Sequence, residues 1–203
     1  MITNIPKKII VHHTAVSRVA APRQFLAVNG YHRDTKDENG DFLFHFGKPS
    51  SLGYYGGYHI LIEPDGSAFR YREDWEQGAH TKGQNLTSLA VCMAGNFDVE
   101  FPTEAQIKTL VGRLKEWQAK YNIPNTQFFL MPHRKFATSK SCYGKLLGDN
   151  WVLEISTPKK SPDDIEKEKQ VVELTSILDA LIALLLKLKI FLNFQTRQKE
   201  PLK

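Results

Sequence analysis

The chain has 203 residues, of which 41% are apolar and 24% are charged, and its formal net charge is +5. That length suits one domain of ordinary size, with or without an appendage, and the composition is that of a soluble globular protein. Two cysteines exclude a disulfide framework, and the modest positive charge favours polyanionic partners without selecting among them.

The first elements along the chain are predicted to be a buried strand, a helix and a long loop. The β-branched run from Ile9 to Val11 enters His12 and His13, which predicts a buried strand that ends in polar residues. Helical spacing of apolar residues follows over residues 21–32. Residues 34–57 are rich in Gly, Asp, Ser and Pro and predict a loop, which at that length is usually functional or disordered.

The middle of the chain alternates between short apolar runs and helical patterns. A Pro-Asp-Gly turn between two apolar runs is a hairpin signal. The predicted elements are strands at 58–62, 67–71, 88–94 and 128–131 and helices at 102–120 and 146–155. This mixture predicts the α/β class, with a central, mostly β-sheet layer flanked by helices.

The composition changes after the closing helix. Residues 157–164 predict a linker, and residues 165–203 predict a helical tail that is apolar and basic. Charges such as Lys187 and Lys189 interrupt a stretch of transmembrane length, which disfavours a membrane-spanning anchor. We expect the tail to pack on the domain, to pair with another copy or to lie on an anionic membrane.

Three residues suited to metal binding stand at or after the ends of predicted strands. His12 ends the first strand, and His133 ends another and shortly precedes Cys142. Two imidazoles and a thiolate are a suitable zinc set that leaves one coordination position open. The same residues also suit a cysteine–histidine nucleophile pair, and their spacing does not decide between the two hypotheses.

Five short motifs follow one another between residues 7 and 152. They are Val11-His12-His13-Thr14-Ala15, Gly57–Gly66, Gly78–Asn85, Ala90–Phe97, and the pair His133-Arg134 with Cys142. In that order they resemble the type-2 N-acetylmuramoyl-L-alanine amidases, a family that includes phage endolysins and the peptidoglycan recognition protein domain. Each motif is weak by itself, but five in order are specific.

The resemblance implies an amidase domain over residues 1–156, with Zn²⁺ as the cofactor and bacterial peptidoglycan as the partner. The implied reaction is hydrolysis of the amide between N-acetylmuramic acid and L-alanine, and no nucleic-acid partner is expected. The implied zinc ligands are His12, His133 and Cys142. His13 is the alternative to His12, or else a residue that supports the ligands.

The resemblance also implies catalytic and substrate-binding residues. Tyr58 and Lys140 match the catalytic tyrosine and lysine of the phage enzymes, and both side chains suit donation to an oxyanion. His80, Thr81 and Asn85 match positions that line the muropeptide groove.

Two other functions compete with the zinc amidase. Some recognition domains lack the cysteine ligand and only bind peptidoglycan, whereas this chain keeps Cys142, Tyr58 and Lys140. A cysteine hydrolase is the other alternative. No apolar segment precedes Pro6, so no signal peptide is predicted. We therefore expect a phage-type endolysin, made in the cytoplasm and acting on the cell wall after release.

Overall fold

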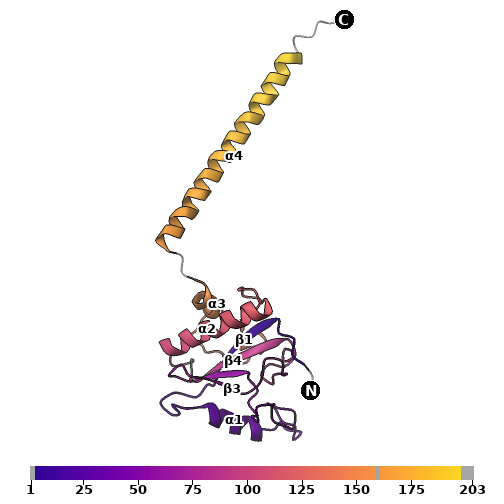
Figure 1. Cartoon of the computed structure of the whole chain (residues 1–203), viewed down its shortest axis with the longest axis vertical. Helices are drawn as coiled ribbons and strands as arrows, with labels where there is room; N and C mark the ends of the chain where they lie inside the picture. Colours follow the sequence, from indigo (N-terminus) through magenta and orange to yellow (C-terminus); the bar gives the residue numbers. More distant parts are fainter. Residues whose placement is uncertain (1–2, 159–160, 198–203) are drawn as a thin grey trace. The chain divides into compact units, whose positions relative to one another are not determined.

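The computed structural model describes residues 3–158 and 161–197 and divides the chain into two compact units, Met1–Thr157 and Pro158–Lys203. The first unit is a mixed sheet with helices on both faces (Figure 1). The second unit contains one long helix. The predicted α/β class, with a central sheet between helices, is confirmed.

Five strands form one sheet in the order β3-β2-β4-β1-β5. The strands are β1 (Lys8–His13), β2 (Ile60–Ile62), β3 (Ala68–Arg70), β4 (Ser88–Met93) and β5 (Leu130–Pro132). Strand β1 is parallel to both of its neighbours, β4 and β5, and only β3 runs antiparallel to its partner. Parallel strands covered on both faces read as continuous apolar runs, as β1 and β4 do.

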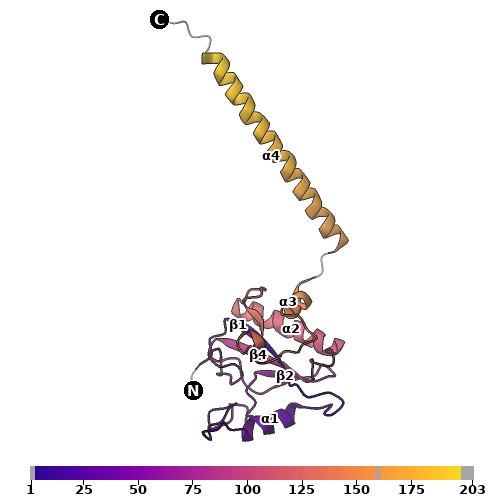
Figure 2. The same ribbon diagram turned by 180° about the vertical axis from the view of Figure 1, so that it is seen from behind.

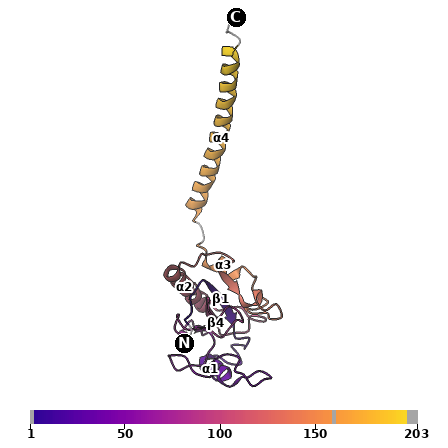
Figure 3. The same ribbon diagram turned by 90° about the vertical axis from the view of Figure 1, so that its right-hand side faces the viewer.

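The sheet lies between two helical layers, with α2 (Glu104–Tyr121) and α3 (Trp151–Ser156) on one face and α1 (Phe25–Asp34) on the other (Figures 2 and 3). The main core lies under α2 and contains Leu110 and Trp117 of that helix together with Ile9 and Val11 of β1. The smaller core lies under α1 and contains Leu61 with partly buried aromatic rings.

Helix α2 agrees closely with its prediction because its signals are local. The side chain of Thr103 accepts a hydrogen bond from the backbone of Gln106, and the Gln106 side chain accepts one from the backbone of Thr103. This capping box fixes the start of the helix. At the other end, Asn122 adopts the left-handed conformation with φ 52° that commonly closes a helix.

Helices α1 and α3 begin later than predicted. The Glu63 carboxylate accepts the backbone N–H groups of Gln24 and Phe25 at 2.8 Å, so the residue that directly follows β2 sets where α1 starts. Before α3, the Leu146 N–H is bonded to the Phe97 carbonyl at 3.1 Å, which holds residues 146–150 in turns. Both departures come from tertiary contacts.

The second unit contains α4 (Pro162–Arg197). It begins inside the segment predicted as a linker, because Ser161 caps the Asp164 N–H and Pro162 occupies the first helical position. The basic residues at 199 and 203 that were predicted to end the tail lie outside the described residues. Within residues 3–158 and 161–197, no helix is both long and apolar enough to span a bilayer.

Candidate metal centre and active site

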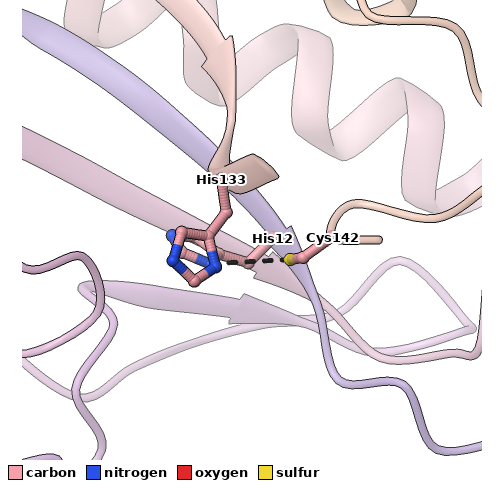
Figure 4. A group of neighbouring side chains, drawn as sticks. All are labelled: His12, His133 and Cys142. Carbon is pink, nitrogen blue, oxygen red and sulfur yellow. Dashed lines mark hydrogen bonds between the residues drawn. The ribbon is translucent and has the colours of Figure 1, made fainter. Parts of the chain in front are cut away.

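Three segments that are distant in the sequence bring His12, His133 and Cys142 together (Figure 4). His12 lies near the carboxyl end of β1, and His133 directly follows the adjacent parallel strand β5 at the start of the 3-10 helix η1 (His133–Lys135). Parallel neighbours present their carboxyl ends at the same edge of a sheet. Cys142 comes from the loop after η1, and one potential ligand atom from each residue lies within 4.8 Å of the others.

Alternation along β1 decides between the two adjacent histidines. His12 points to the face of α1, where its Nδ1 lies 3.7 Å from the Cys142 Sγ and its ring centroid lies 4.6 Å from that of His133. His13 points to the opposite face, and its Nδ1 accepts the Phe97 N–H at 3.0 Å. The backbone N–H of His13 donates to the Cys142 Sγ at 3.3 Å, so His13 contacts the cluster through its backbone.

A chain of hydrogen bonds fixes the tautomer of His12. The Ser88 hydroxyl donates to the Gln84 carbonyl at 2.7 Å, so its oxygen can only accept from the His80 Nε2 at 3.3 Å. The His80 Nδ1 is therefore an acceptor, and the His12 Nε2 donates to it at 3.1 Å. The lone pair of His12 consequently lies on Nδ1, facing the sulfur of Cys142.

Arg134 holds the loop that carries Cys142. Its guanidinium donates to the carbonyls of Ser141, Gly144 and Leu147 at 3.1, 2.7 and 2.6 Å and to the Asp149 carboxylate at 2.6 Å. Its backbone N–H donates to the Cys142 carbonyl at 2.8 Å. The rigid fork of five donors in arginine suits this role, in which one side chain satisfies several carbonyls of a turn.

Asp98 anchors the same loop from the other side. Its carboxylate accepts the Ser141 hydroxyl and the Lys145 backbone N–H, both at 2.8 Å. Neither Asp98 nor Ser88 was predicted from the sequence as part of the site, and Arg134 was noted only within a motif. Their partners are backbone groups of distant segments, which no local pattern in the sequence reveals.

Burial favours the neutral forms of the metal-binding groups. Burial lowers the pKa of His12 well below its usual value, and neighbouring His80 and His133 lower it further. Burial raises the pKa of the Cys142 thiol to about 12, although the His13 N–H and the charges of Arg134 and Lys140 oppose the shift. A neutral imidazole is ready to ligate a metal, whereas an activated nucleophilic cysteine requires a lowered thiol pKa.

Tyr58 lies between the cluster and a groove. Its ring centroid is 4.9 Å from that of His12, and burial raises the pKa of its hydroxyl well above the usual value, so the hydroxyl stays protonated. The groove has a volume of about 450 Å³ and runs along α1. Its lining includes Thr14, Val28, Tyr31, His32, Phe44 and Tyr58.

The sequence model of the family described as N-acetylmuramoyl-L-alanine amidase matches residues 3–145. The chain belongs to this family. The matched segment contains the cluster His12, His133 and Cys142, and also Tyr58 and Lys140.

Known proteins of the amidase family resemble the chain over different lengths. A human N-acetylmuramoyl-L-alanine amidase is 28% identical over 75% of this chain, and an endolysin of Klebsiella phage KP32 is 35% identical over 42% of it. The chain spans only 25% of the human protein's length and 57% of that endolysin's.

Solved structures have the same fold. The amidase LysC from Clostridium intestinale is 25% identical, with a TM-score of 0.52 over 70% of this chain and 78% of its own. A complex of the peptidoglycan recognition proteins LCa and LCx with tracheal cytotoxin gives a TM-score of 0.55 at 23% identity, over 71% of this chain and 81% of the matched chain. This second likeness concerns the fold alone.

The remaining predicted residues of the amidase domain occupy different environments. Lys140 is exposed, and its charge lowers the pKa values of both His133 and Cys142. Thr81 and His80 are buried, with exposed fractions of 3% and 8%, and the Asn85 side chain accepts the backbone N–H groups of both. His80 contacts His12, whereas contact of these three residues with a substrate stays a prediction.

Proposed function

We propose that this chain is a zinc-dependent N-acetylmuramoyl-L-alanine amidase of the phage-endolysin type. It would hydrolyse the amide between N-acetylmuramic acid and L-alanine in bacterial peptidoglycan. The observation that supports the proposal most is the cluster His12, His133 and Cys142, whose ligand atoms lie within 4.8 Å of one another. The cluster is part of a domain whose family is named for this reaction.

The cluster fits a zinc ion by its chemistry and by its support. Zn–S and Zn–N bonds of about 2.3 and 2.0 Å at a tetrahedral angle place the two ligand atoms about 3.5 Å apart. The Cys142 Sγ and the His12 Nδ1 lie 3.7 Å apart. The other ring nitrogen of His12 is bonded to His80, as is usual for a histidine that ligates a metal. When bound, zinc would supply Lewis acidity and hydroxide at neutral pH.

The chain's own side chains would stabilise the charge that develops during amide hydrolysis. The Tyr58 hydroxyl remains protonated beside His12, so it can donate a hydrogen bond to an oxyanion. Lys140 adds a positive charge whose field reaches His133 and Cys142. The groove lined by Tyr58 and α1 gives the muropeptide a place to bind, and His80, Thr81 and Asn85 would shape the neighbouring wall.

The cysteine-hydrolase hypothesis is the weaker alternative. Burial raises the pKa of the Cys142 thiol to about 12, which opposes formation of a thiolate without a metal. The non-catalytic binder is the stronger alternative, because recognition proteins share the fold. The presence of a complete ligand set together with Tyr58 and Lys140 supports the enzyme over the binder.

Metal analysis combined with peptide release tests these alternatives. We expect one zinc ion per chain and release of free stem peptide from purified peptidoglycan. Cys142→Ser should lose both. Full activity after exhaustive chelation would exclude the zinc mechanism. Binding to peptidoglycan with no peptide release by the zinc-loaded protein would favour the binder.

We also propose that the protein is made in the cytoplasm and reaches the wall after release by other means. The likeness to an endolysin of Klebsiella phage KP32 supports this proposal. Fractionation of the native host expressing a tagged protein is the test. The tagged chain should stay inside intact cells, and export without lysis would contradict the proposal.

A further inference from the structure

Helix α4 exposes a long series of apolar side chains. From Val171 to Leu188, the residues on one stripe are between 51% and 65% exposed within the described part of the chain. The stripe consists of Val171, Leu174, Leu178, Leu181, Leu185 and Leu188. Soluble proteins rarely leave a contiguous apolar surface of this length in water, so such a surface usually marks an interaction site.

The spacing of the stripe is that of a coiled-coil seam. Successive residues are alternately three and four positions apart, which corresponds to positions a and d of a seven-residue repeat. Every charged residue between Val171 and Leu188 lies outside these positions, as does Lys189 just beyond. Counting Val171 as position a, Glu173 and Lys187 are at c, Asp179 is at b and Lys189 is at e.

The stripe is wider than a minimal two-helix seam. Ile177 and Leu184 fall at position g and are 51% and 61% exposed, and Ile182 at position e is 46% exposed, so the apolar face extends to both sides of the a and d seam. A face of that width is typical of helices that form the core of a bundle. The charges Glu173, Asp179 and Lys187 would remain in water on the opposite side of such a bundle.

A lipid surface fits these features less well. The acidic side chains of Glu173 and Asp179 border the apolar stretch, and their repulsion by an anionic bilayer would offset its attraction for Lys187 and Lys189. A second copy of α4 presents the same stripe and is self-complementary to it.

We propose that α4 is a self-association element through which the chain pairs with at least one further copy of itself, along the seam from Val171 to Leu188. Association would place two or more amidase domains in one particle. Because the cell wall is a repeating polymer, a second domain would bind at a raised effective concentration once the first is bound. This inference does not depend on catalysis.

Sedimentation equilibrium of the full chain is the test, with two matched double variants. The seam variant is Leu178→Glu with Leu185→Glu, both at position a. The control is Val172→Glu with Leu186→Glu, both at position b, on the same helix and with comparable exposure. At tens of micromolar, the wild type and the control should sediment at no less than twice the 23.2 kDa of one chain, and the seam variant at one chain mass.

Each other result would overturn the inference. A monomeric wild type excludes self-association at these concentrations. Loss of association in both variants, or in neither, would show that the a and d seam is not the contact. The remaining measurement is co-sedimentation of the protein with vesicles that contain phosphatidylglycerol. A wild type that is monomeric in buffer but sediments with the vesicles would identify α4 as a membrane-binding helix instead. Circular dichroism of all three proteins checks that the helix persists.

Discussion

The Nε2 atom of His12 donates to the Nδ1 atom of His80 across 3.1 Å, and this bond leaves the lone pair of His12 facing Cys142. The relationship assigns His80 a role that its position in a motif did not suggest. His80 orients a metal ligand, and the bond from its own Nε2 to Ser88 keeps it in the tautomer that accepts. Residues that support ligating histidines in this way commonly tune metal affinity.

Replacement of His80 should therefore weaken zinc binding without removing a ligand. We expect His80→Ala to lower zinc affinity by about 10- to 100-fold. His80→Asn should keep most of the affinity, because the Asn oxygen can accept at the position of Nδ1. Chelator competition measures both variants. Equal affinity for His80→Ala and the wild type would show that the bond to His12 has no influence on the metal.

Tyr58 and Lys140 should affect turnover but not metal content. Each is a potential donor to the oxyanion and neither belongs to the ligand cluster. We expect Tyr58→Phe and Lys140→Ala each to reduce kcat by about 100- to 1,000-fold. Zinc content measured on the same samples is the internal control. A loss of zinc parallel to the loss of turnover would assign these residues to the integrity of the site.

Arg134 should matter for the loop that holds Cys142. Arg134→Ala would leave the carbonyls of Ser141, Gly144 and Leu147 without their donor, which should cost about 2–3 kcal/mol of unfolding free energy. Arg33→Ala is the matched control, because it breaks an exposed pair with Asp34 that should contribute little. Urea unfolding measures the free energy of unfolding of both variants. Equal losses would show that Arg134 does not stabilise the loop that holds Cys142.

Acid should destabilise the metal-free protein between about pH 6.5 and pH 4. Burial lowers the pKa of His32 to about 3 and that of His59 to about 4, so both stay neutral in the folded state. In the unfolded chain they bind protons near pH 6.5. The unfolded state therefore holds more protons in this window, and stability falls as the pH is lowered through it.

Urea unfolding in chelator at several pH values measures this dependence. His59→Gln can keep an acceptor for the Ala90 N–H and a donor for the Glu76 carbonyl, the two backbone partners of the His59 ring. It should flatten the slope of unfolding free energy against pH, whatever its effect at pH 7.5. An unchanged slope would show that His59 is not one of the groups responsible.

The sequence by itself determined the elements whose signals are local. The capping box at Thr103 and the apolar spacing after it predict α2, and the β-branched run before His12 predicts β1. The same sequence contained His12, His133 and Cys142 as a candidate set, and the ordered motifs indicated an amidase. A function that depends on residue types and on short motifs can be predicted from the sequence.

Only the tertiary structure decided how these residues meet. Alternation along β1 separates His12 from His13, but the sequence does not say which face of the sheet the cluster occupies. That choice depends on α2 covering one face and on β5 pairing beside β1. The tautomer of His12 depends on His80 and Ser88, which come from other segments. Such contacts join residues far apart in the chain, so their geometry exists only after the sheet and its loops have packed.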